Sequence, residues 1–312
     1  MKIGIVLNPV AGAGRAARLW PKFEAEIRQQ LGGFTLMRTE GPEDAARFAR
    51  QLAAQGCELV IASGGDGTIG ETVDGLLTAG LAPNALPRFA ILPCGTGSDF
   101  ARSIGMTGTP QEMAARIAAG KVREIDAGRV TFVDDEGRAA MRHFINIASF
   151  GLSGPTSRAV NKAKRSGKAS GQMLFMWHTI RELIRYRFQD VRIFVDGAPA
   201  IEARIAVAAA ANGRYFGGGM MIAPQAEMDD GMFDFVIFKG AAKLTLIRDL
   251  RLLYSGSHVG HPAVTILRGR RIIVEPAGDP ALNAALLDID GESPGSIPVT
   301  FEVLPKAIKV IC

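Results

Sequence analysis

Three short glycine-rich segments contain the residues of this sequence that are best suited to bind an anion. They are residues 8–14, 64–68 and 93–99, and each follows an apolar run and precedes a segment with helical spacing. Glycines at the end of a strand let backbone N–H groups approach an anion closely, and the helix N-terminus that follows adds a favourable partial charge. Three such loops at one edge of a sheet predict a ligand that carries several phosphates.

The middle loop adds a carboxylate to this pattern. Asp66 stands between Gly65 and Gly67 and is followed by Thr68 after the second glycine. A carboxylate there can reach a metal ion bound to phosphates, and a divalent ion that offsets phosphate charge is common in phosphoryl transfer. Neither G-x-G-x-x-G nor G-x-x-x-x-G-K-[ST] appears at these strand ends, so a Rossmann dinucleotide site and a P-loop are both disfavoured.

A second acidic group lies near the end of the chain. Asp290, Gly291 and Glu292 follow the apolar segment 285–289. A carboxylate in this group could act as a general base toward a hydroxyl. Asp-Gly is also a strong signal for a tight turn between strands. From the residues alone, a hairpin turn with exposed charges is the favoured interpretation.

The segments that position the three loops alternate between strand and helix. Apolar runs predict the strands, and apolar spacing of three and four predicts the helices. Thr109, Pro110 and Glu112 form a typical helix start, with Thr at the N-cap. This alternation predicts a parallel sheet covered on both faces. The expected strands are 2–7, 34–39, 59–62 and 89–92, and the expected helices are 15–31, 42–55 and 69–77.

The remainder of the chain has the pattern of antiparallel β-structure. Asp196 and Gly197 stand between two alternating segments, which is a strong hairpin signal. The pattern changes near Asp126, where we place the domain boundary. We therefore expect an α/β domain followed by an all-β domain. The expected strands of the second are 123–133, 140–149, 191–195, 201–207, 233–238, 264–267, 271–274, 285–289 and 299–303, with helices near 155–165, 172–187 and 242–254.

The composition is that of a folded protein rather than a disordered or fibrous one. Of 312 residues, 47% are hydrophobic and 21% are charged, and the net charge of +5 is too mild to choose among anionic partners. The longest apolar run, 205–211, is far shorter than the roughly 20 residues of a membrane helix. The N-terminus turns polar at Asn8 and Pro9, too early for a signal peptide. We therefore expect a cytoplasmic protein.

Metal and nucleic-acid sites of familiar kinds are not indicated. Cys57, Cys94 and Cys312 have neither metal nor redox spacing, and His258 and His261 have no third ligand beside them in the sequence. Aromatic residues beside basic ones are few, and no recognition motif appears, so we expect no nucleic-acid partner.

The order of these motifs resembles that of the diacylglycerol kinase catalytic-domain family, in particular the small bacterial lipid kinases, which are similar to sphingosine kinases. The matching residues run in family order over nearly the whole chain. They are Asn8-Pro9 with Gly12, the loop from Gly64 to Thr68, Pro93-x-Gly95-Thr96-Gly97-x-Asp99-Phe100-Ala101-Arg102, Asp126, Asn146 with Gly151, Asn212-Gly213-x-Tyr215-x-Gly217-Gly218-Gly219, Asp229-Asp230-Gly231 and Asp290-Gly291-Glu292.

The resemblance implies an N-terminal α/β nucleotide domain and a C-terminal antiparallel β-sandwich domain for the lipid substrate, with ATP in the cleft between them. It also implies that the C-terminus returns to the first domain. The expected division is therefore 1–126 with about 300–312, and 127–299. The implied cofactors are ATP and Mg²⁺, and the implied reaction is transfer of the γ-phosphoryl group of ATP to a hydroxyl of a lipid such as diacylglycerol.

The resemblance also implies roles for single residues in the reaction. Glu292 would accept the hydroxyl proton, with Asp290 nearby. Asp66 and Asp126 would approach the Mg²⁺ ion on the phosphates. The residues expected to contact the nucleotide are Asn8, Pro9, Gly12, Thr39, Gly64, Gly65, Asp66, Gly67, Thr68, Thr96 and Gly97.

A structural magnesium ion is implied at the Asp-Asp-Gly turn. Its side-chain ligand would be Asp230, and backbone oxygens of Glu227 and Met232 would complete the protein ligands. Elsewhere two positions depart from the family pattern: Gly70 and Ser98 stand where the family usually has Asn. Ser is shorter than Asn and has one polar atom, and Gly has no side chain, but neither change removes a carboxylate proposed for chemistry.

Two alternatives to a lipid kinase stay open. NAD kinases share the Gly-Gly-Asp-Gly-Thr loop, but the sequence contains no Asn-Glu pair, which NAD kinases use to bind the ribose hydroxyls of NAD. The other alternative is a nucleotide- or lipid-binding protein without catalysis, which the changes at Gly70 and Ser98 make conceivable.

The expected partner is a lipid substrate presented at a membrane surface. Residues 172–188 are rich in large apolar side chains, which fits a core helix or, in part, an acyl-chain pocket or a bilayer contact. Lys162, Lys164, Arg165 and Lys168 precede this segment and could attract anionic lipid. We expect peripheral contact at the inner face of the membrane. The sequence names neither the lipid nor the oligomeric state, so a homodimer stays open.

Overall fold

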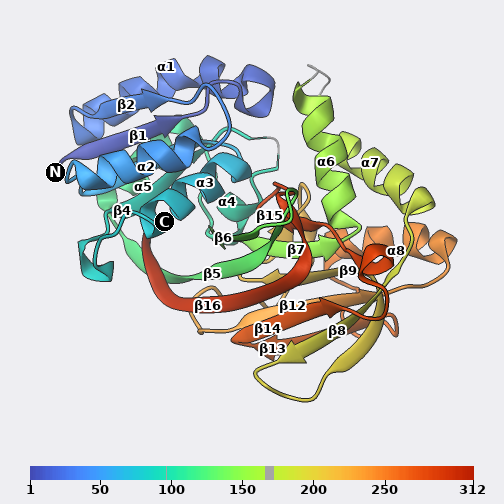
Figure 1. Ribbon diagram of the computed structural model, residues 1–312. Coiled ribbons are helices and arrows are strands. Elements are labelled where there is room, and N and C mark those ends of the chain that lie inside the picture. The colour runs from blue at the N-terminus through green and yellow to red at the C-terminus, as the bar shows by residue number, and fades with distance from the viewer. Residues whose placement is uncertain (96, 166–171) are drawn as a thin grey trace. The chain divides into compact units, whose positions relative to one another are not determined.

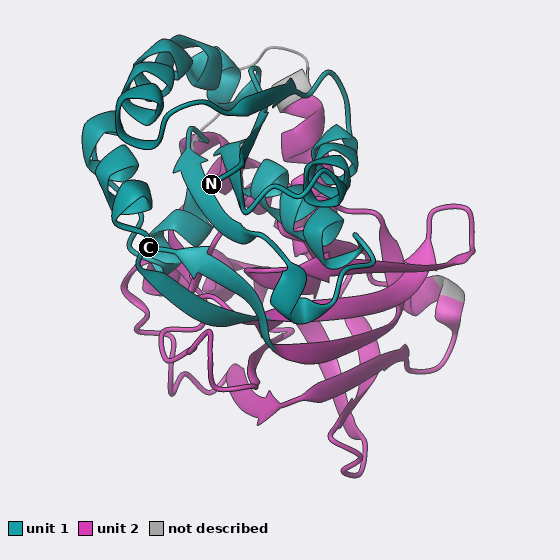
Figure 2. Cartoon of the chain, turned by 90° about the vertical axis from the view of Figure 1, so that its left-hand side faces the viewer, with its two compact units in different colours: residues 1–126, 306–312 teal, residues 127–305 magenta. Residues whose placement is uncertain are grey.

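The computed structural model describes residues 1–95, 97–165 and 172–312 (Figure 1). Thr96, an expected nucleotide contact, and Lys168 lie outside the described residues. The chain divides into two compact units, Met1–Asp126 with Lys306–Cys312, and Ala127–Pro305 (Figure 2). Strands β5 (Val122–Asp134) and β16 (Gly295–Ile311) each belong in part to both units. Within the described residues, no helix has the length and apolar character needed to cross a membrane.

Unit 1 is the expected parallel sheet with helices. Its strand order is β16-β4-β3-β1-β2, and each neighbouring pair is parallel. Helices α1 and α5 pack together, as do α2 and α3. Its elements are β1 (Ile3–Leu7), α1 (Ala11–Leu31), β2 (Thr35–Arg38), α2 (Asp44–Ala54), β3 (Leu59–Gly64), α3 (Asp66–Leu77), the 3₁₀ helix η1 (Pro83–Ala85), β4 (Arg88–Pro93), α4 (Asp99–Ser103) and α5 (Pro110–Ala119).

Burial explains why these segments fold as they do. Strands β1 and β3 are buried at every residue, as is typical of central strands in a covered parallel sheet. Helix α1 buries one face, made by Ala16, Trp20, Phe23 and Ile27 at spacings of three and four. The apolar spacing in the sequence of α1 therefore predicts which face of the helix is buried.

Two helices begin at loops that the sequence singled out. Helix α3 was expected from residue 69 but begins at Asp66, because the glycine-rich loop already forms its first turn. Helix α1 begins at Ala11, but its backbone is not helical at positions 12–14, where the φ angles are left-handed at 61°, 55° and 78°. Regular helix therefore starts at Arg15, as expected, and the three left-handed residues form a tight bend before it.

Unit 2 is the expected antiparallel β-structure with interspersed helices. One run of strands is β13-β12-β9-β7-β15, and another is β9-β8-β14-β16, with β5 paired to both β16 and β6. Its further elements are β6 (Ala139–Phe144), β7 (Ile147–Gly151), α6 (Ser153–Arg165), α7 (Gln172–Arg185), β8 (Gln189–Val195), β9 (Ile201–Ala211), β10 (Tyr215–Phe216), β11 (Met220–Met221), β12 (Phe233–Lys239), α8 (Lys243–Ser255), β13 (Val264–Gly269), β14 (Arg271–Pro276), α9 (Pro280–Asn283) and β15 (Leu287–Ile289).

Strand β9 belongs to both runs, which closes the sandwich around an aromatic core. Its residues 201–205 pair with β8, and its residues 207–211 lie between β12 and β7. Phe144 of β6 stacks on Phe233 of β12 with ring centroids 5.4 Å apart, and Phe150 of β7 stacks on Phe301 of β16 at 6.3 Å. These rings fill the space between the strands.

The single strand expected over residues 140–149 is wrong, because two strands occupy this segment. Strand β6 ends at Phe144 and β7 begins at Ile147. At the break, three successive backbone N–H groups donate to the carboxylate of Asp290. The interruption is therefore caused by a residue that lies about 145 positions away in the sequence.

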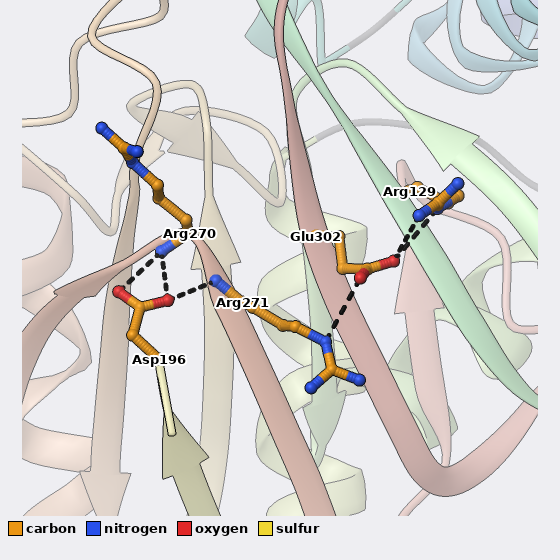
Figure 3. Close-up of polar contacts among 5 residues, drawn as sticks. All are labelled: Arg129, Asp196, Arg270, Arg271 and Glu302. Carbon is orange, nitrogen blue, oxygen red and sulfur yellow. Dashed lines mark hydrogen bonds and ion pairs between the residues drawn. The ribbon is translucent and has the colours of Figure 1, made fainter. Parts of the chain in front are cut away.

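Two carboxylates link neighbouring strands within unit 2 (Figure 3). Glu302 of β16 accepts hydrogen bonds from Arg129 of β5, the shorter at 2.7 Å, and from Arg271 of β14 at 3.2 Å. Asp196, in the turn after β8, accepts the backbone N–H groups of Arg270 and Arg271. The hydrogen bond from Arg129 is the main reason that the pKa of Glu302 lies below its ordinary value.

We predict that Gly75→Ala destabilises unit 1. A Cβ at this position would lie 2.2 Å from the carbonyl oxygen of Ala46, so helices α2 and α3 would have to separate. The free energy of unfolding, measured by urea denaturation, should fall by about 1–3 kcal/mol. Gly33→Ala is the control, because a Cβ at Gly33 meets no atom within 4 Å. Equal losses in the two variants would contradict this packing.

Candidate active site

The expected site residues form two groups, one within each unit. In unit 1 the three glycine-rich loops follow β1, β3 and β4, at the carboxyl ends of neighbouring parallel strands. A Cβ on Gly12 would lie 2.3 Å from the carbonyl oxygen of Cys94, and a Cβ on Gly95 would lie 2.7 Å from the Cα of Gly65. Only glycine allows these approaches, so three backbone segments meet as a phosphate-binding surface requires.

Asn8 connects the first loop to the second. Its Nδ2 donates to Thr68 Oγ1 at 2.9 Å, and its Oδ1 accepts the N–H of Val10 at 3.2 Å. The carbonyl of Pro9 accepts the N–H of Ala17 at 3.2 Å, which ties the loop to the start of the regular helix. The side chain of Asn8 thus holds two loops in place.

Asp66 connects the second loop to the third. As the first residue of α3, it accepts through Oδ1 the backbone N–H of Phe100, in the first turn of α4, at 3.2 Å. Its side chain is half-buried, whereas Gly64 is buried at the end of β3 and Gly67 lies in the first turn of α3. One carboxylate oxygen thus positions α4 while the residue stays accessible.

The third loop ends in a residue with a left-handed backbone. Ser98 has a φ of 53°, and its Oγ donates to the carbonyl of Gly95 at 3.3 Å. Gly97 precedes it. Asn adopts this left-handed conformation more readily than Ser does. At position 98 this chain therefore has Ser where the residue usual in the family, Asn, would suit the backbone better. Thr39 follows β2 beside this sheet edge, where it is buried and its N–H donates to Leu7 at 2.9 Å.

Positive charge lies next to the first loop. Arg15 and Arg18 are exposed at the start of the regular helix, and Arg18 donates to the carbonyl of Ala13 at 3.5 Å. The charge of Arg15 also acts on the thiol of Cys94, whose pKa is raised mainly by burial. Guanidinium groups beside close-packed backbone N–H groups suit a phosphate chain.

Asp126 is buried and bound to backbone. Its Oδ1 accepts the N–H of Lys306 at 2.7 Å, which ties β5 to β16 within unit 1. The expected role of Asp126 near Mg²⁺ stays a prediction, and the bond that the structure shows is one that holds strands together.

In unit 2, Asp290 and Glu292 lie on the expected hairpin. The N–H of Ile289 donates to the carbonyl of Glu292 at 2.7 Å, and the reverse bond is 3.0 Å. Asp290 and Gly291 have φ angles of 47° and 93°, as the two central residues of a type I′ turn require. The Asp-Gly pair therefore makes the turn, and Glu292 is the first residue after it.

The charge of Asp290 is used to fix this turn. Its carboxylate accepts the N–H groups of Ile145 at 2.9 Å, Asn146 at 3.2 Å and Ile147 at 3.0 Å. Its own N–H donates to the carbonyl of Ile147 at 3.0 Å. Hydrogen bonds to an ionised group are stronger than neutral ones, so the hairpin is held rigidly. Asp290 is thus a positioning residue, and Glu292 is the candidate base.

Helix α6 also contacts the hairpin. Asn161 Nδ2 donates to the carbonyl of Gly291 at 2.9 Å and to Glu292 Oε2 at 3.2 Å. One turn earlier, Ser157 Oγ donates to Asp288 Oδ2 at 2.7 Å. These contacts orient the carboxylate of Glu292 and connect it to a second, buried acid.

That buried acid, Asp288, was not among the expected site residues. The pKa of Asp288 is raised to about 7, mainly by burial and to a lesser extent by the negative charges of Glu292 and Asp290. The hydrogen bond from Ser157 and a second one, from the N–H of Gly291 at 2.9 Å, act in the opposite direction. Asp288 therefore carries a proton below about pH 7.

The turn expected to hold a structural magnesium ion is organised by an arginine. Asp230 accepts the N–H of Met232 through Oδ1 at 3.0 Å, and its other oxygen pairs with Arg268. Arg268 also pairs with Asp234 at 3.1 Å. Among the residues that the structure describes, no cluster of three acidic, His or Cys side chains could hold a metal ion. The expected magnesium ion, with Asp230 as its one side-chain ligand and backbone oxygens of Glu227 and Met232, stays a prediction, and the partner that the structure shows on Asp230 Oδ2 is Arg268.

Four side chains of these networks were missed by the sequence analysis. Asp288 is an acid inside an apolar strand segment, which was a usable signal. Ser157 and Asn161 are four residues apart and so share a helix face, but nothing in the sequence says what that face contacts. Arg268 stands opposite Asp234 in the β12–β13 register, which becomes visible only once the strands are paired.

Comparisons with known proteins identify the family of this chain. Residues 2–130 match the diacylglycerol kinase catalytic domain, and residues 146–312 match the YegS C-terminal NAD kinase beta sandwich-like domain. A diacylglycerol kinase of Bacillus subtilis (strain 168) is 30% identical over 317 residues, which cover 98% of this chain and 95% of the relative. One from Mycobacterium tuberculosis (strain ATCC 25618 / H37Rv) is 28% identical over 313 residues, covering 99% and 94%.

The fold agrees with these matches. The crystal structure of a diacylglycerol kinase from Bacillus anthracis str. Sterne superimposes with a TM-score of 0.71 at 22% identity and covers 99% of this chain and 96% of that one. The chain belongs to the diacylglycerol kinase family, a family of lipid kinases. The expected fold class and the family resemblance are both confirmed.

We predict that Asp288→Asn stabilises the protein more at high pH than at low pH. Folding raises the pKa of Asp288 from 3.8 to about 7, so the stability this group contributes is present below pH 3.8 and is lost as the pH rises through about 7. Asn mimics the protonated acid at every pH. The gain in free energy of unfolding over wild type should be larger by roughly 1–3 kcal/mol at about pH 8 than at about pH 5.

Urea denaturation at the two pH values measures this difference. Asp135→Asn is the matched control. Asp135 is an exposed carboxylate that pairs with Arg158 of α6, the helix that also carries Ser157, the partner of Asp288. The control should show a much smaller difference between the two pH values. A pH-independent effect of Asp288→Asn would show that Asp288 does not titrate between them.

Proposed function

We propose that this chain is an ATP-dependent lipid kinase that transfers the γ-phosphoryl group of ATP to a hydroxyl of a lipid such as diacylglycerol. Membership of the family supports this, as do the converging loops of unit 1. The observation that carries most weight is the rigid hairpin of unit 2, where Asp290 accepts three backbone N–H groups and Glu292 follows. A general base must be held in position to act, and this turn does so.

Unit 1 would bind the nucleotide. The N–H groups of the three loops and the guanidinium groups of Arg15 and Arg18 suit a phosphate chain. Asp66 is half-buried and uses one oxygen for α4, so it fits a Mg²⁺ ion that arrives with ATP. When bound, Mg²⁺ offsets negative charge on the phosphates.

Unit 2 would activate the lipid. As the hydroxyl oxygen forms its bond to the γ-phosphorus, its proton passes to the carboxylate of Glu292. The bond from phosphorus to the bridging oxygen breaks, and ADP leaves with that oxygen. Asn161 donates to Glu292 Oε2 at 3.2 Å and so orients the carboxylate for the transfer.

Helix α7 connects an apolar surface with the region of Asp290. A Cβ on Gly217 would lie 2.7 Å from the ring of Phe175, so this helix packs directly on the glycine-rich loop after β10. In β10, directly before this loop, the carbonyl of Tyr215 accepts Asn146 Nδ2 at 2.9 Å, and the N–H of Asn146 donates to Asp290. We therefore place the acyl chains along α7 in this proposal.

The outer side of α7 suits contact with a bilayer. Met173, Trp177 and Ile184 are exposed, Met173 by 87%. Arg181 lies over the ring of Trp177 at 5.3 Å, and Arg185 is exposed. Exposed apolar side chains with basic neighbours favour binding to an anionic membrane surface. This gives the lipid substrate a route from the bilayer and supports peripheral contact with the inner face of a membrane.

We predict that Glu292→Gln lowers kcat for lipid phosphorylation by about 10²–10⁴, the usual contribution of a general base. The assay follows label from γ-labelled ATP, with Mg²⁺, into an extract of mixed bacterial and eukaryotic lipids. Label should enter the organic phase with the wild-type protein, and chromatography of the product names the acceptor. Glu136→Gln, in the exposed turn between β5 and β6, is the matched control and should keep wild-type activity.

The same assay separates the alternatives. NAD is included as a second acceptor, and label on NAD instead of lipid would support an NAD kinase. ATP binding without transfer to any acceptor would support a binding protein. Wild-type turnover by Glu292→Gln would remove Glu292 from the role of base.

We predict that Met173→Ser with Trp177→Ser weakens binding to phosphatidylglycerol vesicles by about tenfold, because about 1–2 kcal/mol of apolar burial is lost. Sedimentation with the vesicles measures the bound fraction. Leu282→Ser is the control, since Leu282 of α9 is also an exposed apolar side chain. Equal binding by the double variant and wild type would place the membrane contact elsewhere.

A further inference from the structure

The turn of Asp229, Asp230 and Gly231, just before β12, is where the family resemblance implies a structural divalent ion. An ion there would neutralise carboxylate charge and fix the turn. In this chain both oxygens of Asp230 are already engaged. Oδ1 accepts the N–H of Met232 at 3.0 Å, and Oδ2 pairs with the guanidinium group of Arg268.

Strand register brings Arg268 to this position. Arg268 lies on β13 directly opposite Asp234 of β12, and its Nε lies 3.1 Å from Asp234 Oδ1. The side chain of Asp234 is 6% exposed, and that of Arg268 is 51% exposed. One planar guanidinium group thus joins a carboxylate of the turn to a carboxylate of the strand, which its fixed fork of donors allows.

The positive charge of Arg268 acts on the carboxylates around the turn. The negative charges of Glu227 and Asp230 both act on Asp234, and the positive charge of Arg268 acts in the opposite direction. The guanidinium group of Arg268 contacts two of these carboxylates, those of Asp230 and Asp234. A divalent ion on Asp230 Oδ2 would have to displace the guanidinium group of Arg268 from that oxygen, because the two positive groups repel each other at such a short distance.

We propose that Arg268 takes the place of the structural metal ion in this chain, so that the turn needs no divalent cation. The proposal does not rest on the kinase reaction. It does bear on the candidate site, because Asp234 pairs with Ala211 of β9. The next residue, Asn212, donates through Nδ2 to the carbonyl of Ile145 at 2.7 Å, beside the strand break that binds Asp290.

Metal content and thermal stability of the full chain test this proposal, without nucleotide so that an ion on phosphates is not counted. The protein is treated with EDTA or with millimolar Mg²⁺ or Ca²⁺, desalted, and analysed for bound metal. Wild type should retain no stoichiometric divalent ion, and its Tm should be the same in EDTA and in Mg²⁺. Arg268→Gln should lower the Tm in EDTA by about 3–8 °C, and Mg²⁺ or Ca²⁺ should restore part of the loss.

Two further variants make the result specific. Arg192→Gln is the matched control, because Arg192 is 47% exposed and pairs with Glu275 across β8 and β14 at 3.0 Å. It should gain no response to ions. Arg268→Lys keeps the charge and should also stay insensitive to ions. One ion per wild-type chain, or a wild-type Tm that falls in EDTA, would overturn the proposal even if Arg268→Gln does not fold. An Arg268→Gln protein no more responsive to ions than Arg192→Gln would overturn it as well.

Discussion

The carboxylate of Asp290 is the group on which the structure of unit 2 around the candidate base depends. Three backbone N–H groups between β6 and β7 donate to it, so a segment that could have continued as one strand becomes two. Phe144 ends β6 and Phe150 lies in β7, and both rings enter the aromatic core. The same carboxylate closes the hairpin that carries Glu292. Packing of the core and placement of the candidate base therefore share one anchor, and an amide at position 290 would offer only one accepting oxygen where two are used.

The loops of unit 1 are held together by close backbone contacts that only glycine permits. Gly12 against Cys94 and Gly95 against Gly65 are approaches that a single methyl group would prevent. Asn8 and Asp66 then connect the loops through one hydrogen bond each to a neighbouring loop. Loops that are joined before a ligand arrives lose little conformational entropy on binding it, which favours tight positioning of a flexible phosphate chain.

Local patterns were sufficient for the fold class, and long-range contacts explain what they missed. Buried parallel strands, the capping box of Thr109 with Glu112 and the Asp290-Gly291 turn all depend on neighbouring residues, so the sequence predicts them. The break after Phe144 depends on a carboxylate at the other end of unit 2, and the start of α3 depends on how a loop packs. The resemblance likewise implied a cation at the Asp230 turn, and the guanidinium group that we propose in its place is brought there only by the pairing of β12 with β13. The burial of Asp288 needed the position of α6, which no periodicity reports.

The membership of Lys306–Cys312 in unit 1 has a consequence for synthesis of the chain. The strand that lies beside β4, and the backbone N–H that Asp126 binds, are translated only after the whole of unit 2. At about 5–20 residues per second, the ribosome needs roughly 10–40 s to make the intervening segment. During that interval β4 is an edge strand, a position that invites pairing with other chains. Unit 2 can thus be translated completely before unit 1, most of which is translated first, has the segment of β16 that completes its sheet.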